Sequence, residues 1–159
     1  MRRTTLTRPD AAIQRETLLR ISFIGVFFGG IIDSVVTTIF FVIMVVLWLA
    51  ATPDALKYGS YQAIAHFKTQ LQDDTLVRTV TFGLGALGSV IGGYYAARFS
   101  RSALVLNGGL SAWACIGFAL YLFNAYPELL TQTQLLPGVI GGILCGAIGG
   151  YLRAWLIRD

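Results

Sequence analysis

The chain has 159 residues, of which 55% are apolar and 13% charged, and its formal net charge at pH 7 is +4. Together with its 18 glycines, the apolar residues make up about two thirds of the chain, against roughly half in ordinary globular domains. This composition excludes a disordered chain, a disulfide scaffold and most soluble enzymes, and it predicts one all-α membrane domain over residues 1–159.

Four apolar segments are long enough to cross a bilayer, whose hydrocarbon core takes about 20 helical residues. They cover about 21–51, 79–97, 103–125 and 135–157. A polar stretch rich in Asp, Gln and Lys separates the first two segments, whereas only residues 98–102 separate the second and third. The sequence therefore predicts four transmembrane helices, arranged as two helical hairpins.

The residues before the first span are basic, as they are at the start of a signal peptide. The apolar run that follows them, however, is about thirty residues long and ends at Trp48 without a small-residue cleavage site, unlike a signal peptide. We therefore interpret residues 21–51 as a retained transmembrane helix.

The first span contains Asp33, the one acidic residue within an apolar segment. A carboxylate at the centre of a bilayer costs about 2.5–3.5 kcal/mol on insertion scales, so such residues usually face protein or water. Gly25, Gly29 and Thr37 lie on the same helix face, because they are spaced from Asp33 by multiples of four. We expect this small and polar stripe to face the bundle, since lipid offers its polar groups no partner.

Two interpretations of Asp33 remain open. Its depth, within about one turn of the inner surface, allows it to be hydrated or to pair with Arg98, Arg101 or Arg153. Alternatively, Asp33 takes part in proton or cation handling, with Asn107 of the third span at a similar depth.

The outer loop after the first span predicts a short amphipathic helix over about 60–71. Its apolar residues fall at helical spacing and are Tyr61, Ile64, Phe67 and Leu71. We expect this helix to lie on the outer membrane surface or to cap the bundle. His66, the sole histidine of the sequence, has no neighbouring ligand cluster and is expected to be a surface residue.

Residues with the chemistry of an active site are scarce. Cys115 and Cys145 fall at comparable depth near the middle of the membrane, where their simplest role is that of small apolar-compatible side chains. A G-x-G-x-x-G pattern over residues 83–88 lies inside a span with no preceding strand, so it does not indicate a nucleotide site. We therefore expect no catalytic residue, no metal and no cofactor.

Orientation follows from the arginines and lysines, because cytoplasmic flanks carry an excess of them. Of the 12 basic residues, those on one side are Arg2, Arg3, Arg8, Arg15, Arg20, Arg98, Arg101, Arg153 and Arg158. The other side has only Lys57, Lys68 and Arg78. The sequence predicts both termini in the cytoplasm, and anionic lipid rather than nucleic acid accounts for its basic side.

Small residues recur at every fourth position of the second and fourth spans. The second span has Gly85, Ser89, Gly93 and Ala97, and the fourth has Gly138, Gly142, Gly146, Gly150 and Ala154. Such a small-residue ladder lets a neighbouring backbone approach closely. We expect these two helices to pack against each other at the centre of the bundle; the alternative is that one ladder faces a partner subunit or a second copy.

The two hairpins also match each other in sequence. A shift of 57 residues sets 91–94 on 148–151, and both segments read Ile-Gly-Gly-Tyr. Because both hairpins start inside, we expect a parallel duplication, related by an axis along the membrane normal.

Three glycine-rich segments carry a resemblance to a group of proteins. They are Gly-Gly-Ile-Ile-Asp at 29–33, Gly-Gly-Tyr-Tyr-Ala-Ala-Arg at 92–98 and Gly-Gly-Tyr-Leu at 149–152. The chain resembles uncharacterised small bacterial four-helix integral membrane proteins with a first-helix Asp and G-G-Y-x-A-A-R helix ends. Trp155 stands where the second copy would have its terminal Arg. The resemblance implies the architecture and a location in the bacterial inner membrane, and it implies no activity.

These features leave three classes of function. We expect a non-catalytic membrane protein that acts by binding, as an accessory or assembly subunit of a membrane complex or as an immunity-type protein. The alternative is a small oligomeric transporter or channel, coupled to protons or cations, whose site comprises Asp33, Thr37, Asn107, Arg98 and Arg101. An intramembrane enzyme is the least favoured class. The expected partners of the protein are membrane lipid and either further copies of the same chain or a larger membrane complex.

Overall fold

The computed structural model of the chain describes residues 21–52, 54, 57, 66, 67, 69, 70, 73–125 and 132–157. Its helices are α2 (Phe23–Ala51), α4 (Thr75–Arg98), α5 (Leu104–Leu110), α6 (Trp113–Ala125) and α7 (Gln132–Leu156). No strand occurs among these residues. Three helices, α2, α4 and the 136–156 part of α7, are long and apolar enough to cross a membrane, which is compatible with a multi-pass membrane protein.

Polar caps determine where α2 and α4 begin. The Ser22 hydroxyl accepts a hydrogen bond from the Gly25 N–H at 3.1 Å. The Asp74 carboxylate accepts from the N–H groups of Leu76 (2.7 Å) and Val77 (3.3 Å). Each cap satisfies N–H groups that have no partner within the helix. Helix α4 therefore begins at Thr75, one turn before the apolar run that predicted a start at residue 79.

The third predicted span, 103–125, is helical but interrupted at residues 111–112, which separate α5 from α6. The Ser111 hydroxyl donates to the Gly108 carbonyl at 2.6 Å, and the Ser111 N–H lies 3.1 Å from the Asn107 carbonyl. The Ala112 N–H turns back to the Gly109 carbonyl, a three-residue bond that tightens the helix end. The span is thus divided into two helices, which hydropathy does not reveal because it responds to apolar length and not to this local hydrogen bonding.

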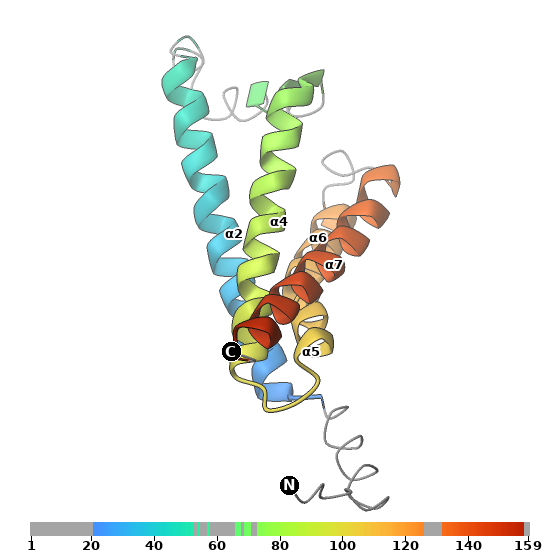
Figure 1. Ribbon diagram of the computed structural model, residues 1–159. Coiled ribbons are helices and arrows are strands. Elements are labelled where there is room, and N and C mark those ends of the chain that lie inside the picture. The colour runs from blue at the N-terminus through green and yellow to red at the C-terminus, as the bar shows by residue number, and fades with distance from the viewer. Residues whose placement is uncertain are drawn as a thin grey trace, which may run out of the picture.

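The helices meet at one end of the molecule and diverge toward the other (Figure 1). We call the end where α2 and α5 begin and α4 and α7 finish the crossing end, and the opposite one the far end. Helix α2 packs along α4, α4 is crossed by α7, and α5 packs on α7. The α2–α4 pair and the α6–α7 pair lean apart toward the far end.

Glycines make the crossing end compact. A Cβ atom at Gly29 would collide with Ala96, and one at Gly93 would collide with the backbone of Gly146. A Cβ atom at Gly108 would likewise meet the Gly146 carbonyl. Since helices in lipid associate by close van der Waals contact, these positions explain why α2, α4, α5 and α7 converge here.

The small-residue ladders therefore make contact over only part of their length. As expected, α4 and α7 pack against each other, and Gly93 lies against Gly146. Gly142 is in ordinary contact with Ala112 at 3.7 Å, whereas Gly85 and Gly138 have no atom within 4 Å of a Cβ position. The ladders pack closely at the crossing end and lack neighbours at the far end.

At the far end, a small apolar cluster joins α2 to the start of α4. Trp48, Phe67 and Val77 are its buried members, and the Trp48 indole donates to the Gln70 side-chain oxygen at 2.7 Å. Most of the expected amphipathic helix at 60–71 lies outside the described residues, as do residues 1–20 with their five arginines. Of the described positions within 60–71, Phe67 is buried and His66 is exposed.

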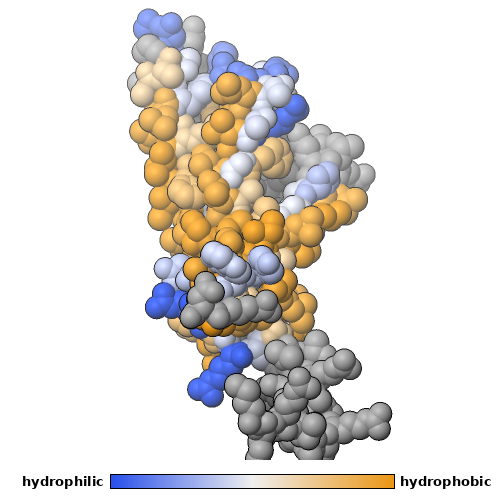
Figure 2. All heavy atoms as spheres, viewed as in Figure 1, coloured by the Kyte–Doolittle hydropathy of each residue, from blue (hydrophilic) through white to orange (hydrophobic). Residues whose placement is uncertain are grey.

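The exposed surface agrees with a membrane environment. Hydrophobic residues cover the middle of the face shown in Figure 2, and hydrophilic residues lie near both ends. Exposed apolar side chains include Phe23, Val42 and Leu47 of α2 and Leu87 of α4. An apolar band of this extent is unusual for a soluble monomer and normal for helices in lipid.

Candidate functional site

The candidate site is built around Asp33, whose side chain is fully buried, with 0% exposure. Gly25 and Gly29 of the same stripe are buried too, so this face of α2 does point into the bundle as expected. On α4, Gly88 lies against Thr37 and Gly92 lies against Asp33. Because these glycines have no side chains, α4 comes close enough for the residue between them to reach the carboxylate.

That residue is Ser89, whose hydroxyl lies 3.3 Å from both carboxylate oxygens of Asp33. The Thr37 hydroxyl donates to Asp33 Oδ1 at 3.2 Å. The Cys115 thiol, in the first turn of α6, also lies close enough to the Asp33 carboxylate to interact with it. Asp33 therefore joins three helices, and we call this group of four residues the Asp33 cluster.

The hydroxyl and thiol donors of the Asp33 cluster are neutral, and the hydroxyl oxygens lie at long hydrogen-bond distances from the carboxylate oxygens. Hydroxyl bonds to an ionised carboxylate are typically about 2.5–2.7 Å long, shorter than the 3.2–3.3 Å found here. Within the described part of the chain, the one ion pair is that of Lys57 with Asp54, far from this cluster. The Asp33 carboxylate is thus enclosed by protein without a cationic partner.

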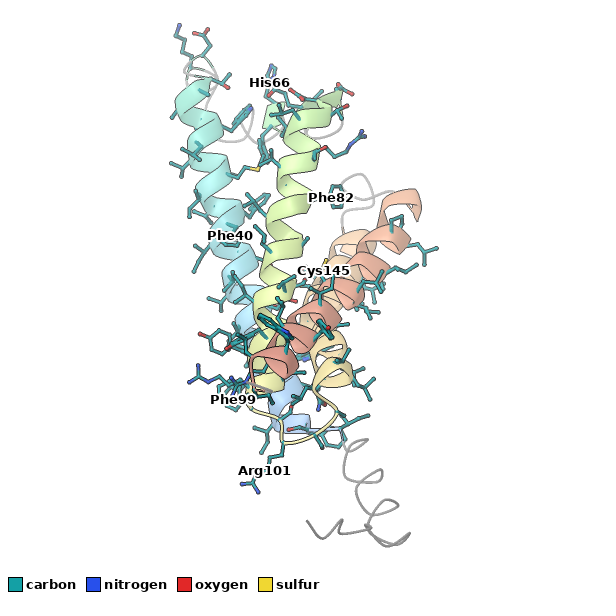
Figure 3. The ribbon with its side chains drawn as sticks, in the orientation of Figure 1. Phe40, His66, Phe82, Phe99, Arg101 and Cys145 are labelled. Carbon is teal, nitrogen blue, oxygen red and sulfur yellow. The ribbon has the colours of Figure 1, made fainter. Side chains whose placement is uncertain are left out.

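Among the described residues Asp33 forms no ion pair with an arginine, and its side chain is enclosed by protein. The Arg98 guanidinium lies over the Tyr95 ring, and the Arg153 guanidinium lies over the Tyr94 ring. Arg101 is exposed in the turn after α4, where Figure 3 shows it pointing away from the bundle. The helix contacts at Gly88 and Gly92 give Asp33 hydroxyl partners at its own depth, while the arginines stay at the crossing end.

Asn107 is also fully buried, but it belongs to a different contact. Its side-chain oxygen accepts from the Ser22 N–H at 2.9 Å, and its amide donates to the Ser102 carbonyl at 2.8 Å. It therefore fastens the start of α2 to the start of α5. Of the five predicted site residues, only Asp33 and Thr37 come together.

Sequence reasoning missed the roles of Ser89 and Cys115 in the cluster. Its four-residue spacing placed Ser89 in the packing ladder of the second span. The signal that could have revealed its role in the cluster is its hydroxyl group, in a ladder made otherwise of glycine and alanine. Cys115 gave no periodic signal, because the break before α6 sets its position. Cys115 and Cys145 are both free thiols.

The break between α5 and α6 lies close to the Asp33 cluster. The backbone of α2 passes the break at Gly30, where a Cβ atom would collide with the Trp113 indole. The same indole donates to the Val26 carbonyl at 3.1 Å. These contacts hold the first turn of α6, and with it Cys115, against the α2 face that contains Asp33.

The chemistry open to this cluster is limited. The described residues contain no group of three or more His, Cys, Asp and Glu side chains that would hold a metal ion. His66 lies at the far end, as Figure 3 shows, so it offers no base to Asp33. The cluster can stabilise helix contacts, or it can take up a proton or a small monovalent cation at the carboxylate.

Comparison with models of protein families gives no match, and neither curated proteins nor solved structures show a significant similarity to the chain.

Proposed function

We propose that this chain is a non-catalytic integral membrane protein that acts by binding, as an accessory or assembly subunit of a membrane complex. The observation that carries the proposal is the lack of neighbours around the far-end glycines. A Cβ atom at Gly83, Gly85, Gly138 or Gly141 would have no atom of the described residues within 4 Å. At the crossing end, by contrast, the same residue type is in contact with another helix.

A glycine in a helix costs about 1 kcal/mol relative to alanine. At the crossing end, close helix contact offsets this cost, but at the far end no contact among the described residues does. Small-residue faces in membrane helices typically serve association with another helix. A helix of a partner protein, or of a second copy, would supply the missing contact.

A groove at the far end supports the same proposal. It lies between α2 and α4, is mainly apolar, and is lined by Thr37, Phe41, Met44, Thr81, Leu84 and Gly85. A partner helix that packs here would place an apolar side chain against this lining. An immunity-type protein would act through the same kind of contact.

The proposal includes a topology. Both termini are in the cytoplasm of a bacterial cell, with the crossing end at the cytoplasmic face of the inner membrane. Arg98, at the end of α4, Arg101, in the turn that follows, and Arg153, in the last turn of α7, lie at the crossing end, in agreement with the excess of basic residues on cytoplasmic flanks. The proposed duplication of hairpins is supported by the packing of α2 on α4 and of α5 on α7.

Purification from native membranes in mild detergent tests the binding role. We expect the wild-type chain to migrate above its monomer mass, and the variants Gly85→Leu and Gly141→Leu to lose this association. Leu87→Phe, which enlarges an exposed side chain of α4, is the control and should leave it intact. A wild-type chain that runs alone at monomer mass would contradict the proposal.

A second candidate function is a carrier or channel coupled to protons or cations. It is favoured by the buried Asp33 carboxylate, which has no cationic partner among the described residues. Charged groups kept inside a membrane protein often mark ion or proton pathways. Asp33→Asn keeps the shape and removes the titratable group, so proton-linked uptake should fall to background in this variant. Uptake at the wild-type rate in Asp33→Asn would remove this candidate.

A further inference from the structure

Four side chains at the crossing end form a row that connects α7 to α4. The Arg153 guanidinium lies 5.9 Å from the centre of the Tyr94 ring, and the Arg98 guanidinium lies 5.9 Å from the centre of the Tyr95 ring. The two tyrosine rings meet edge to face, with centroids 5.7 Å apart. We call these four residues the Arg–Tyr row.

Close helix packing positions the row. A Cβ atom at Gly149 would collide with the Val90 carbonyl and lie 2.7 Å from the Tyr94 N–H. Because α7 approaches α4 so closely at Gly149, Arg153, one turn further on, reaches the Tyr94 ring. Each guanidinium is therefore held by an aromatic face, an arrangement worth about 0.5–1 kcal/mol at exposed sites.

The positive charge of the row has no counterion within the described part of the chain. Asp33 is enclosed in its own cluster, and the remaining described acids, Asp54, Asp73 and Asp74, lie at the far end. Neither Arg98 nor Arg153 forms an ion pair among the described residues. Arg101, exposed in the adjoining turn, adds a third positive charge at the same end.

The surroundings indicate which anion would bind. Tyr151, Leu152 and Trp155 of α7 are exposed near the row, and they give acyl chains an apolar surface. Aromatic and basic residues at the end of membrane helices lie at the level of the lipid headgroups. Guanidinium groups bind phosphate with paired N–H donors, and basic pockets between membrane helices bind anionic headgroups.

We propose that the Arg–Tyr row binds the phosphodiester headgroup of an anionic phospholipid. Arg98 and Arg153 donate to phosphate oxygens, Tyr94 and Tyr95 hold the two guanidiniums in place, and the acyl chains lie along α7. This site is separate from the Asp33 cluster and from the far-end glycines, which are Gly83, Gly85, Gly138 and Gly141. Its failure in an experiment would leave the proposed binding function unaffected.

Native mass spectrometry of the full chain in mild detergent tests the proposal, with phosphatidylglycerol and phosphatidylcholine as probes. We expect retention of phosphatidylglycerol over phosphatidylcholine. Since each basic residue near an anionic surface contributes about a fivefold affinity, Arg98→Gln or Arg153→Gln should each weaken retention about fivefold, and the double variant about 25-fold. The double variant Lys57→Gln with Arg78→Gln removes the same charge at the far end and should retain the lipid like wild type.

Two further variants test the role of the rings. Tyr94→Phe keeps an aromatic face for Arg153 and should retain phosphatidylglycerol, whereas Tyr94→Leu should weaken retention as much as Arg153→Gln. Equal retention by wild type and the double Arg98→Gln, Arg153→Gln variant would overturn the proposal. Displacement of the lipid by inorganic phosphate at equal concentration would also overturn it, because the site would then belong to a soluble anion.

Discussion

At the scale of single residues, the sequence predicted which polar side chains are buried better than it predicted their partners. The stripe around Asp33 is inside the bundle because its four-residue spacing places small and polar groups on one face. Its partners Ser89 and Cys115 come from helices whose approach depends on glycine contacts and on the break after α5. Such distances between helices are not encoded in any local pattern.

Asn107 provides a test at this scale. It accepts from Ser22 and donates to Ser102, and it is fully buried. Asn107→Leu would remove both hydrogen bonds, and a buried polar group that stays unpaired costs about 1–3 kcal/mol. We expect a clearly lower thermal unfolding midpoint in detergent. Asn124→Leu, at an exposed position of α6, should leave the midpoint unchanged, and equal midpoints for the two variants would contradict the role of Asn107.

At the scale of helices, apolar length and small-residue spacing predicted the long elements and the contact of α4 with α7. They did not predict that the third span divides, since the hydrogen bonds of Ser111 and Ala112 decide that locally. Nor did the ladders reveal how far the contact extends. A four-residue repeat specifies a helix face, whereas the crossing of two straight helices limits close contact to a few turns.

Two glycines of one ladder test this limit on the same helix. Gly93 lies against the Gly146 backbone, so Gly93→Ala should force α4 and α7 apart and lower the free energy of unfolding by more than about 1–3 kcal/mol, the usual cost of overpacking. Gly85 has no neighbour, so Gly85→Ala should stabilise the isolated chain by up to about 1 kcal/mol. Steric-trap or denaturant unfolding in detergent measures both changes. Equal effects of the two substitutions would contradict the observed packing.

At the scale of the whole molecule, the order of helices follows from connection length. Only a short turn links α4 to α5, so the crossing end collects the start of α5 and the end of α4 (Figure 1). The divergence toward the far end could not be predicted, because it depends on where the glycine contacts stop. The excess of basic residues on one side predicts that the crossing end faces the cytoplasm.

Cysteine accessibility tests that orientation. Ser102→Cys places a thiol in the turn at the crossing end, and Asp73→Cys places one just before α4 at the far end. Because basic residues mark the cytoplasmic side, a membrane-impermeant maleimide should label Asp73→Cys in intact spheroplasts and Ser102→Cys only after lysis. The unsubstituted chain, whose Cys115 and Cys145 lie partly buried within the helices, is the background control. Labelling of Ser102→Cys in intact spheroplasts would contradict this orientation. It would place the crossing end, with the Arg–Tyr row, at the outer surface, and the far-end glycines toward the cytoplasm.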